Sequence, residues 1–165
     1  MLEYLSEAVV LNKEPNGDLD ARVSLFTKKF GKLVAKAKSV KRIVSKLSAH
    51  LEPGNLIDAR IVEKNGLQVV DALKKSRLPI NPSHLYFLDC LLPEGEAEPH
   101  IWAMLLSGDF SWPSILKILG WDPKTASCAG CNSKQVSAFD IRSQEFFCHS
   151  CSLKLSQDEL LYIYH

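Results

Sequence analysis

Two pairs of cysteines are the residues whose type and spacing most directly indicate chemistry. Cys128 and Cys131 form one Cys-x2-Cys motif, and Cys148 and Cys151 form a second one after sixteen intervening residues. Each motif directs two thiolates at one point, and two motifs complete the tetrahedral coordination that Zn²⁺ prefers. Because protein sulfurs fill all four positions, none remains for water or substrate, and we predict a structural zinc ion.

Two other interpretations of these cysteines are a redox motif and four unrelated buried thiols. A redox motif needs only one pair, in a thioredoxin-like βαβ setting that the sequence does not indicate. We expect His149, between the last two cysteines, to face solvent rather than to bind the metal. Cys90 has apolar neighbours, and we expect it to be buried as a small core residue.

Basic residues are concentrated in one segment of the chain. Residues 21–51 contain nine Lys or Arg residues and no acid, whereas residues 78–116 contain five acids and no Lys or Arg. A charge run is often only a solvated face, but unpaired like charges repel one another and indicate an anionic partner. We therefore predict a nucleic-acid-binding surface. Its predicted residues are Arg22, Lys28, Lys29, Lys32, Lys36, Lys38, Lys41, Arg42 and Lys46.

Aromatic residues and catalytic motifs add little to this prediction. We expect most of the aromatic side chains to be core residues, with Phe30 as the one candidate for stacking on a base. The sequence has no Gly-x4-Gly-Lys-Ser/Thr loop, no Gly-x-Ser-x-Gly motif and no His-x-Glu motif of the zinc deaminases. We therefore expect no enzymatic activity.

The sequence predicts that the basic residues lie on and between short β-strands. In residues 32–39, Leu33, Ala35 and Ala37 alternate with lysines, which is the period of a half-buried strand. Asn65-Gly66 predicts a tight hairpin. The expected strands are residues 5–11, 21–28, 32–39, 56–63 and 67–73. Five short strands in so few residues fit a closed OB-fold barrel, because closure removes exposed edges.

The pattern changes to helices after Pro79. Asn81 precedes a proline, as an N-cap does, and predicts a helix over residues 84–92. The other expected elements are a surface linker at 93–99, helices after Pro99 and at 114–119, a hairpin within 137–147, and a last helix at 160–164. The predicted fold is α+β: an OB-fold domain at 1–78, then a small helical domain at 79–165 with an inserted four-cysteine zinc knuckle at about 128–151.

The first residues and the length of the apolar runs indicate the cellular compartment. The first residues, MLEYLSEAVVLNKE, are acidic and do not read as a secretory signal. No apolar run approaches the roughly 18 residues that cross a bilayer. We expect a cytoplasmic, nucleoid-associated protein, in which thiols stay reduced.

Two segments of the sequence resemble the RecO family of bacterial recombination mediators. The first is VVLNKEPNGDLDARVSLFTKKFGKLVAKAKSVKRIVSKLSAHLEP, and the second runs from ILKILGWDPKTASCAGC to FFCHSC. The resemblance covers residues 5–73 and 115–161. The helical region between the barrel and the first cysteine pair is shorter than is usual in the family.

The resemblance implies an N-terminal OB-fold, a zinc element, and binding of single- and double-stranded DNA. It implies strand annealing, and work beside RecR, and RecF in many bacteria, to displace single-strand-binding protein so that RecA can load. The DNA-contacting residues implied by the resemblance are chiefly Lys36, Lys38, Lys41, Arg42 and Lys46.

Two alternatives of other classes stay open from the sequence. An OB-fold and zinc-ribbon protein that binds RNA or ribosomes would share the basic barrel and the zinc, and would differ by a preference for structured RNA. A thiol redox enzyme would show a reactive cysteine pair of low pKa once zinc is removed.

Overall fold

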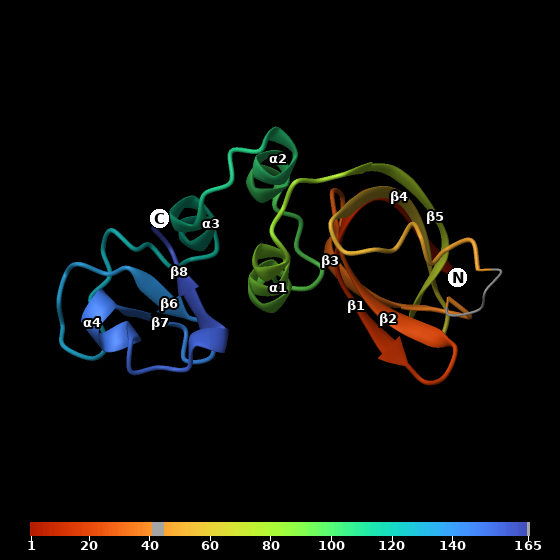
Figure 1. Cartoon of the computed structure of the whole chain (residues 1–165). Coiled ribbons are helices and arrows are strands. Elements are labelled where there is room, and N and C mark those ends of the chain that lie inside the picture. Colours follow the sequence, from red (N-terminus) through yellow and green to blue (C-terminus); the bar gives the residue numbers. More distant parts are fainter. Residues whose placement is uncertain (41–44, 165) are drawn as a thin grey trace. The chain divides into compact units, whose positions relative to one another are not determined.

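The computed structural model describes residues 1–40 and 45–164, and the chain forms two compact units (Figure 1). We call Met1–Leu106 the barrel unit and Ser107–His165 the cysteine unit. Within the described residues, no helix is long and apolar enough to cross a membrane.

Five strands of the barrel unit close into a barrel in the order β1-β2-β3-β5-β4. Neighbouring strands pair antiparallel, except for β3 and β5, which pair parallel where Lys36 faces Gln68. This arrangement confirms the predicted OB-fold. The strands are β1 Leu2–Asn16, β2 Asp20–Thr27, β3 Gly31–Ala37, β4 Asn55–Glu63 and β5 Leu67–Arg77.

The long strand β1 pairs with two neighbours, β4 and β2, and so helps to close the barrel. Its first part pairs with β4, its second part pairs with β2, and the register shifts between Val10 and Asn12. Such a bulge bends a strand and increases its twist, which lets a small barrel close. Asn65 and Gly66, with φ of 51° and 96°, make the predicted hairpin between β4 and β5.

The inside of the barrel is filled by alternate residues of each strand. Leu33, Ala35 and Ala37 of β3 are buried in this core, as their alternation predicts. Val40 and Leu51, from the segment between β3 and β4, are also buried there. The described residues on either side of 41–44 therefore contribute to the core.

Two helices of the barrel unit, α1 Pro82–Leu91 and α2 Pro99–Ser107, follow the barrel. The side chain of Asn81 accepts a hydrogen bond from the Ser83 N–H, as a helix N-cap does. Helix α1 contacts β1, and Trp102 of α2 lies with its ring centroid 5.9 Å from that of Phe26 on β2. The first compact unit, Met1–Leu106, therefore includes α1 and nearly all of α2.

Residues 93–99, expected to be a surface linker, are held against β3. Glu94 forms a parallel bridge with Lys32, and the Gly95 N–H donates to the Lys32 carbonyl at 2.9 Å. Gly31 has a φ of +70°, and a Cβ atom there would lie 2.0 Å from the Glu96 carbonyl oxygen. Only glycine permits so close a crossing.

The cysteine unit combines short helices with a three-stranded sheet of order β7-β6-β8. Phe139 is fully buried in it, with its ring centroid 5.2 Å from that of Trp121. The predicted hairpin is present as β6 and β7. The elements are α3 Trp112–Ile118, β6 Ala138–Asp140, β7 Glu145–Phe147, α4 His149–Ser152, η1 Gln157–Glu159 and β8 Leu160–Tyr162.

The predicted last helix at 160–164 is wrong. Ser156 makes no side-chain capping bond, and Gln157–Glu159 forms a single 3-10 turn. Leu161 then pairs with Phe139 of β6, and both Leu160 and Leu161 are buried. Pairing with an available strand edge outweighs the local capping pattern.

Candidate metal centre and nucleic-acid interface

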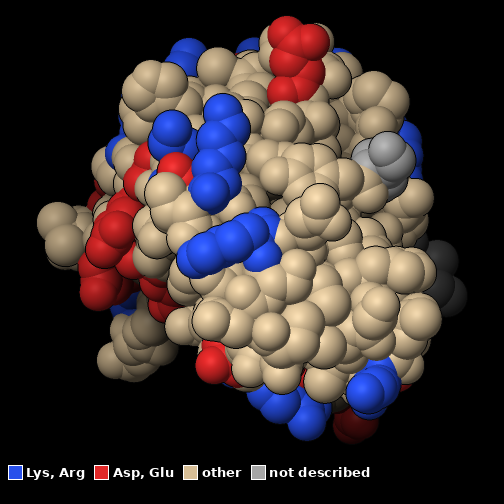
Figure 2. Space-filling model, turned by 90° about the vertical axis from the view of Figure 1, so that its left-hand side faces the viewer, with Lys and Arg blue, Asp and Glu red and all other residues tan. Residues whose placement is uncertain are grey.

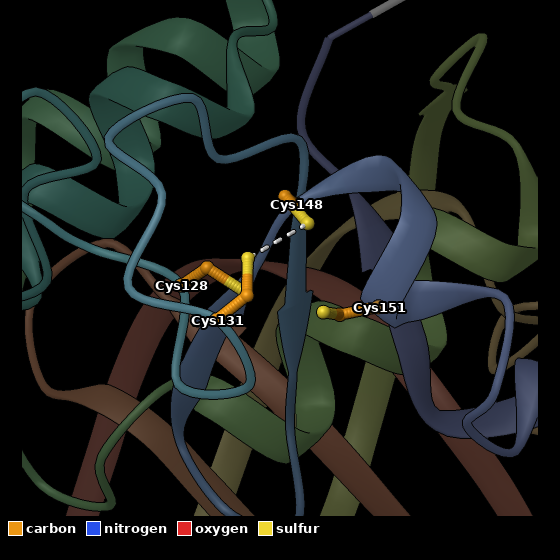
Figure 3. A group of neighbouring side chains, drawn as sticks. All are labelled: Cys128, Cys131, Cys148 and Cys151. Carbon is orange, nitrogen blue, oxygen red and sulfur yellow. Dashed lines mark hydrogen bonds between the residues drawn. The ribbon is translucent and has the colours of Figure 1, made fainter.

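The four cysteines of the two motifs converge in the cysteine unit (Figure 3). Their sulfur atoms all lie within 4.8 Å of one another, and the Sγ atoms of Cys131 and Cys148 are 3.7 Å apart. A tetrahedral site with Zn–S bonds of about 2.3 Å places its sulfurs about 3.8 Å apart. The cluster therefore has the ligand type, number and spacing to hold a metal ion.

Backbone turns position each pair of sulfurs. The Asn132 N–H donates to the Cys128 carbonyl at 2.8 Å, and Asn132 takes a left-handed φ of 63°. A Cβ atom on Gly130 would lie 2.9 Å from the Cys151 sulfur, so the tip of the first turn needs a glycine. Cys148 directly follows β7 and is the N-cap residue of α4, which carries Cys151.

The acid–base properties of the thiols fit a cation at the centre of the cluster. Burial raises the pKa of Cys128, but hydrogen bonds from the backbone of Cys148, Cys131 and Gly130 outweigh it and lower this pKa to about 6. Interactions with the side chains of Cys148 and then Cys128 raise the pKa of Cys151 to about 12. One thiolate thus forms readily, and further thiolates beside it require a compensating positive charge.

The predictions for the exposure of His149 and of Cys90 have opposite outcomes. His149 is exposed, and it is not among the metal-ligating cluster found in the described residues. Cys90 was expected in the core, and this prediction is wrong because Cys90 is exposed. Helix α1 buries Leu85, Leu88 and Leu91, which share one face, whereas Cys90 lies on another.

Three predicted basic residues lie together at one end of β2 and β3. Arg22 and Lys36 are directly paired across the two strands, and Lys38 follows in the next turn. We call Arg22, Lys36 and Lys38 the strand-end cluster. Asp20 lies beside it, with its carboxylate 3.0 Å from the Lys36 ammonium. A hydrogen bond from the Ser39 N–H, and then one from Lys36, hold the pKa of Asp20 below its usual value.

Lys32 is covered by α1, unlike the other predicted basic residues that the structure describes. Its side chain is only 11% exposed, and its ammonium donates to the Asp89 carbonyl at 2.6 Å. The Asp89 carboxylate also accepts from the Ser24 hydroxyl. A small polar cavity of about 180 Å³ opens beside these residues, and Arg22 lines it as well.

Lys28 and Lys29 lie at the other end of the hairpin, in the turn between β2 and β3. The Lys28 ammonium is 3.6 Å from the carboxylate of Glu7, and Lys75 of β5 reaches the same carboxylate at 2.8 Å. Lys74 precedes Lys75 and is exposed. We call the group around Glu7 the turn cluster: Lys28, Lys29 and Lys75.

The remaining predicted residues lie between β3 and β4. Lys46 is exposed. Lys41 and Arg42 lie outside the described residues. Phe30, the candidate for stacking, packs edge-on against Tyr4 at 5.0 Å and contacts the barrel core.

The sequence did not reveal which acidic residues pair with these basic residues in the fold. Glu7, Asp20 and Asp89 all lie outside residues 21–51, but strand pairing and α1 bring them beside Lys28, Lys36 and Lys32. Lys74 and Lys75 were missed because they follow Asp71, outside the acid-free run. Their neighbouring positions in the printed sequence were the only available signal.

The cysteine unit shows a different distribution of charge. Lys117 pairs with Asp122 at 4.0 Å and Arg142 pairs with Glu159 at 2.7 Å. On the face drawn in Figure 2, basic side chains occur singly or in small groups among acidic and uncharged ones. That face therefore carries no continuous basic patch.

Comparison with known proteins agrees with this architecture. Residues 1–77 match the family model described as Recombination protein O N terminal. A DNA repair protein RecO of Dehalococcoides mccartyi is 27% identical over 90% of this chain and 70% of the relative. A DNA repair protein RecO of Bifidobacterium longum is 26% identical over 89% of this chain and 73% of the relative. One of Cutibacterium acnes is 39% identical over 42% of this chain and 28% of the relative. The matched barrel and the relatives that span both units show that the chain is similar to RecO proteins over about nine-tenths of its length.

Proposed function

We propose that this chain is a member of the RecO family and a non-catalytic DNA-binding mediator of recombinational repair. It binds single- and double-stranded DNA, anneals complementary strands and, with RecR, helps RecA load onto DNA covered by single-strand-binding protein. RecF is a further partner in this proposal. The observation that carries it is the strand-end cluster on the outer surface of a RecO-type barrel.

The chemistry of annealing fits a surface of this kind. Annealing breaks no covalent bond, so the protein needs only to hold flexible backbones and reduce their mutual repulsion. Arg22 and Lys38 are exposed, and the Lys36 side chain is 42% exposed although it pairs with Asp20. An ammonium group has three donors, so Lys36 can keep Asp20 and still donate to a phosphate oxygen.

We also propose that the cysteine unit binds Zn²⁺ and that this ion has a structural role. Cys128, Cys131, Cys148 and Cys151 would hold it, as their sulfur type and spacing favour. Bound zinc would supply folding free energy and no reaction chemistry, because four protein thiolates leave no open position.

The test removes charge from the strand-end cluster without reversing it. We expect Lys36→Gln with Lys38→Gln to weaken binding of a single-stranded oligonucleotide, measured by fluorescence anisotropy across a range of salt concentrations. Loss of two phosphate contacts should make the slope of log K against log salt shallower by about 1.4. Annealing of complementary strands coated with single-strand-binding protein should slow in parallel.

The matched control is Lys124→Gln with Lys154→Gln, which removes two exposed charges from the cysteine unit. It should leave the slope unchanged. If the Lys36 and Lys38 variant binds like the wild type, the strand-end cluster is not the interface. A strong preference of the wild type for structured RNA would instead favour the RNA- or ribosome-binding alternative.

A further inference from the structure

The four cysteines of the metal cluster differ in their access to solvent. Cys131 is exposed, Cys148 and Cys151 are partly buried, and Cys128 is buried. A Cβ atom on Gly130 would lie 2.9 Å from the Cys151 sulfur and 3.7 Å from the Cys128 sulfur. The backbone of the first cysteine turn therefore packs against these two sulfurs, and Cys131 is the member of the cluster that solvent reaches most readily.

A broad surface hollow of about 830 Å³ borders the exposed cysteine. Its lining consists of residues 126–132, which include Cys131, and of Glu145 and Phe146 from β7. A small solute such as a peroxide can therefore reach Cys131 from solvent without a rearrangement of the fold.

The sulfur of Cys131 contacts a sulfur of the other motif. The Sγ atoms of Cys131 and Cys148 lie 3.7 Å apart, and Figure 3 shows the two side chains turned toward each other. Redox-sensing cysteines combine solvent access with a second cysteine that is placed to attack the oxidised sulfur. Cys131 and Cys148 have both properties, although they belong to different Cys-x2-Cys motifs.

Resting on the proposed zinc site, we propose that Cys131 and Cys148 are a redox-sensitive pair, which hydrogen peroxide oxidises to a disulfide with release of the metal ion. The Cys131 thiolate attacks one peroxide oxygen, displaces hydroxide and becomes a sulfenic acid. The Cys148 thiolate then attacks the sulfenic sulfur and displaces a second hydroxide, which leaves the disulfide. The two thiolates lose two electrons in total, and the peroxide gains them.

The expected consequence is that oxidation opens the cysteine unit and leaves the barrel unit folded. Only Cys128 and Cys151 remain as ligands after the reaction, whereas a structural zinc site uses four. The strand-end cluster belongs to the barrel, so the oxidised chain should still bind DNA. The pair would thus separate the two units in function without removing the protein from its nucleic acid.

The experiment treats the zinc-loaded full chain with increasing hydrogen peroxide. A chelating dye measures the zinc that is released, and peptide mass spectrometry after thiol alkylation identifies the cross-links. We expect one zinc ion to be released for each cross-linked chain, with Cys131 and Cys148 joined first. Hydrogen exchange should show loss of amide protection in residues 107–165 and its retention in residues 1–106. A dithiol reductant with added zinc should reverse these changes.

Cys148→His tests the pair while keeping a fourth metal ligand, because zinc sites with three cysteines and one histidine are common. We expect this variant to bind zinc and to release it several-fold more slowly at the same peroxide concentration, since Cys131 has lost its partner thiol. Cys90→Ser is the control, because it removes an exposed cysteine outside the cluster, and it should release zinc as the wild type does. If Cys148→His binds no zinc, the cross-links of the wild-type chain still decide.

The possible failures can be told apart. A first cross-link within one Cys-x2-Cys motif, as a redox motif of that kind would form, overturns the assignment of the pair. Retention of zinc at peroxide concentrations that already oxidise Cys90 overturns the inference and leaves the proposed zinc site intact. A chain that binds no zinc when zinc is supplied overturns that site, and this inference with it.

Discussion

The two units of the chain are stabilised in different ways. The strands of the barrel are 7 to 15 residues long, pair around a closed ring and enclose a core of their own. The strands of the cysteine unit have three residues each, and their sheet is open. So few ladder hydrogen bonds do not fix a fold alone. From this comparison we expect the barrel to depend on strand closure and the cysteine unit to depend on metal held by its four sulfurs.

The strongest test of this difference removes one sulfur. We expect Cys131→Ser to lose bound metal and to unfold the cysteine unit, because structural zinc contributes about 10–16 kcal/mol to folding at neutral pH. The barrel unit should keep its structure. Elemental analysis measures the zinc, and hydrogen exchange measures amide protection separately in residues 1–106 and 107–165.

Cys90→Ser is the matched control, because Cys90 is exposed and lies outside the cluster. It should retain the full zinc content and the protection of both units. Full zinc occupancy in Cys131→Ser would refute the ligand assignment. Equal loss of amide protection in the two units would show that the barrel unit does not stay folded when the cysteine unit unfolds.

A smaller effect, confined to the barrel unit, is expected from Gly31→Ala. The added Cβ would meet the Glu96 carbonyl oxygen at 2.0 Å and sit at a φ of +70°. Residues 93–99 must then move off β3, and we expect a loss of about 2–3 kcal/mol in the free energy of unfolding. Chemical denaturation of the barrel unit, followed by the fluorescence of Trp102, measures it.

Gly17→Ala separates the backbone strain from the close contact. Gly17 also has a positive φ, of 79°, but nothing lies within 4 Å of its added Cβ. It should cost only about 1 kcal/mol. If the two variants are equally stable, the crossing of residues 93–99 over Gly31 does not hold the barrel unit together.

The features of the two units that the sequence predicted are mostly ones that depend on a short stretch of chain. The alternation of Leu33, Ala35 and Ala37 identified β3 and its inner face, because side-chain period in a strand depends on the strand alone. The spacing of the cysteines predicted the metal cluster, since each turn places its own two sulfurs. Asn81 predicted the start of α1 for the same reason.

What escaped prediction depends on pairing between distant segments. Asp20 faces Lys36 only through the register of β2 and β3, and Asp89 reaches Lys32 only once α1 covers the barrel. Residues 160–162 carry a helix-start pattern, yet they form a strand because the edge of β6 is available. The sequence therefore predicted that basic residues are concentrated on the barrel, but it did not predict that they divide into two clusters.

The smallest expected effect concerns Glu7 of β1, which pairs with Lys75 of β5 and with Lys28 in the turn between β2 and β3. A hydrogen bond from Lys75 is the main cause that lowers the pKa of Glu7. A carboxyl whose pKa is lower in the folded state stabilises the fold above its unfolded pKa of about 4.3, and this contribution is lost as pH falls through the folded value. We expect Glu7→Gln to lower the melting temperature of the barrel unit slightly at pH 7, and the difference from wild type to vanish below the folded pKa.

Asp18→Asn, which removes an exposed carboxyl from the turn after β1, is the control and should leave the melting temperature at pH 7 unchanged. A gap between wild type and Glu7→Gln that persists at the lowest pH would mean that Glu7 acts through packing rather than charge. Because the Glu7 pairs lie at the protein surface, where salt screens them, the gap at pH 7 should also narrow as salt is added. A gap that is insensitive to salt would place Glu7 with the buried residues that hold the barrel closed, rather than with the surface charges that position the turn cluster.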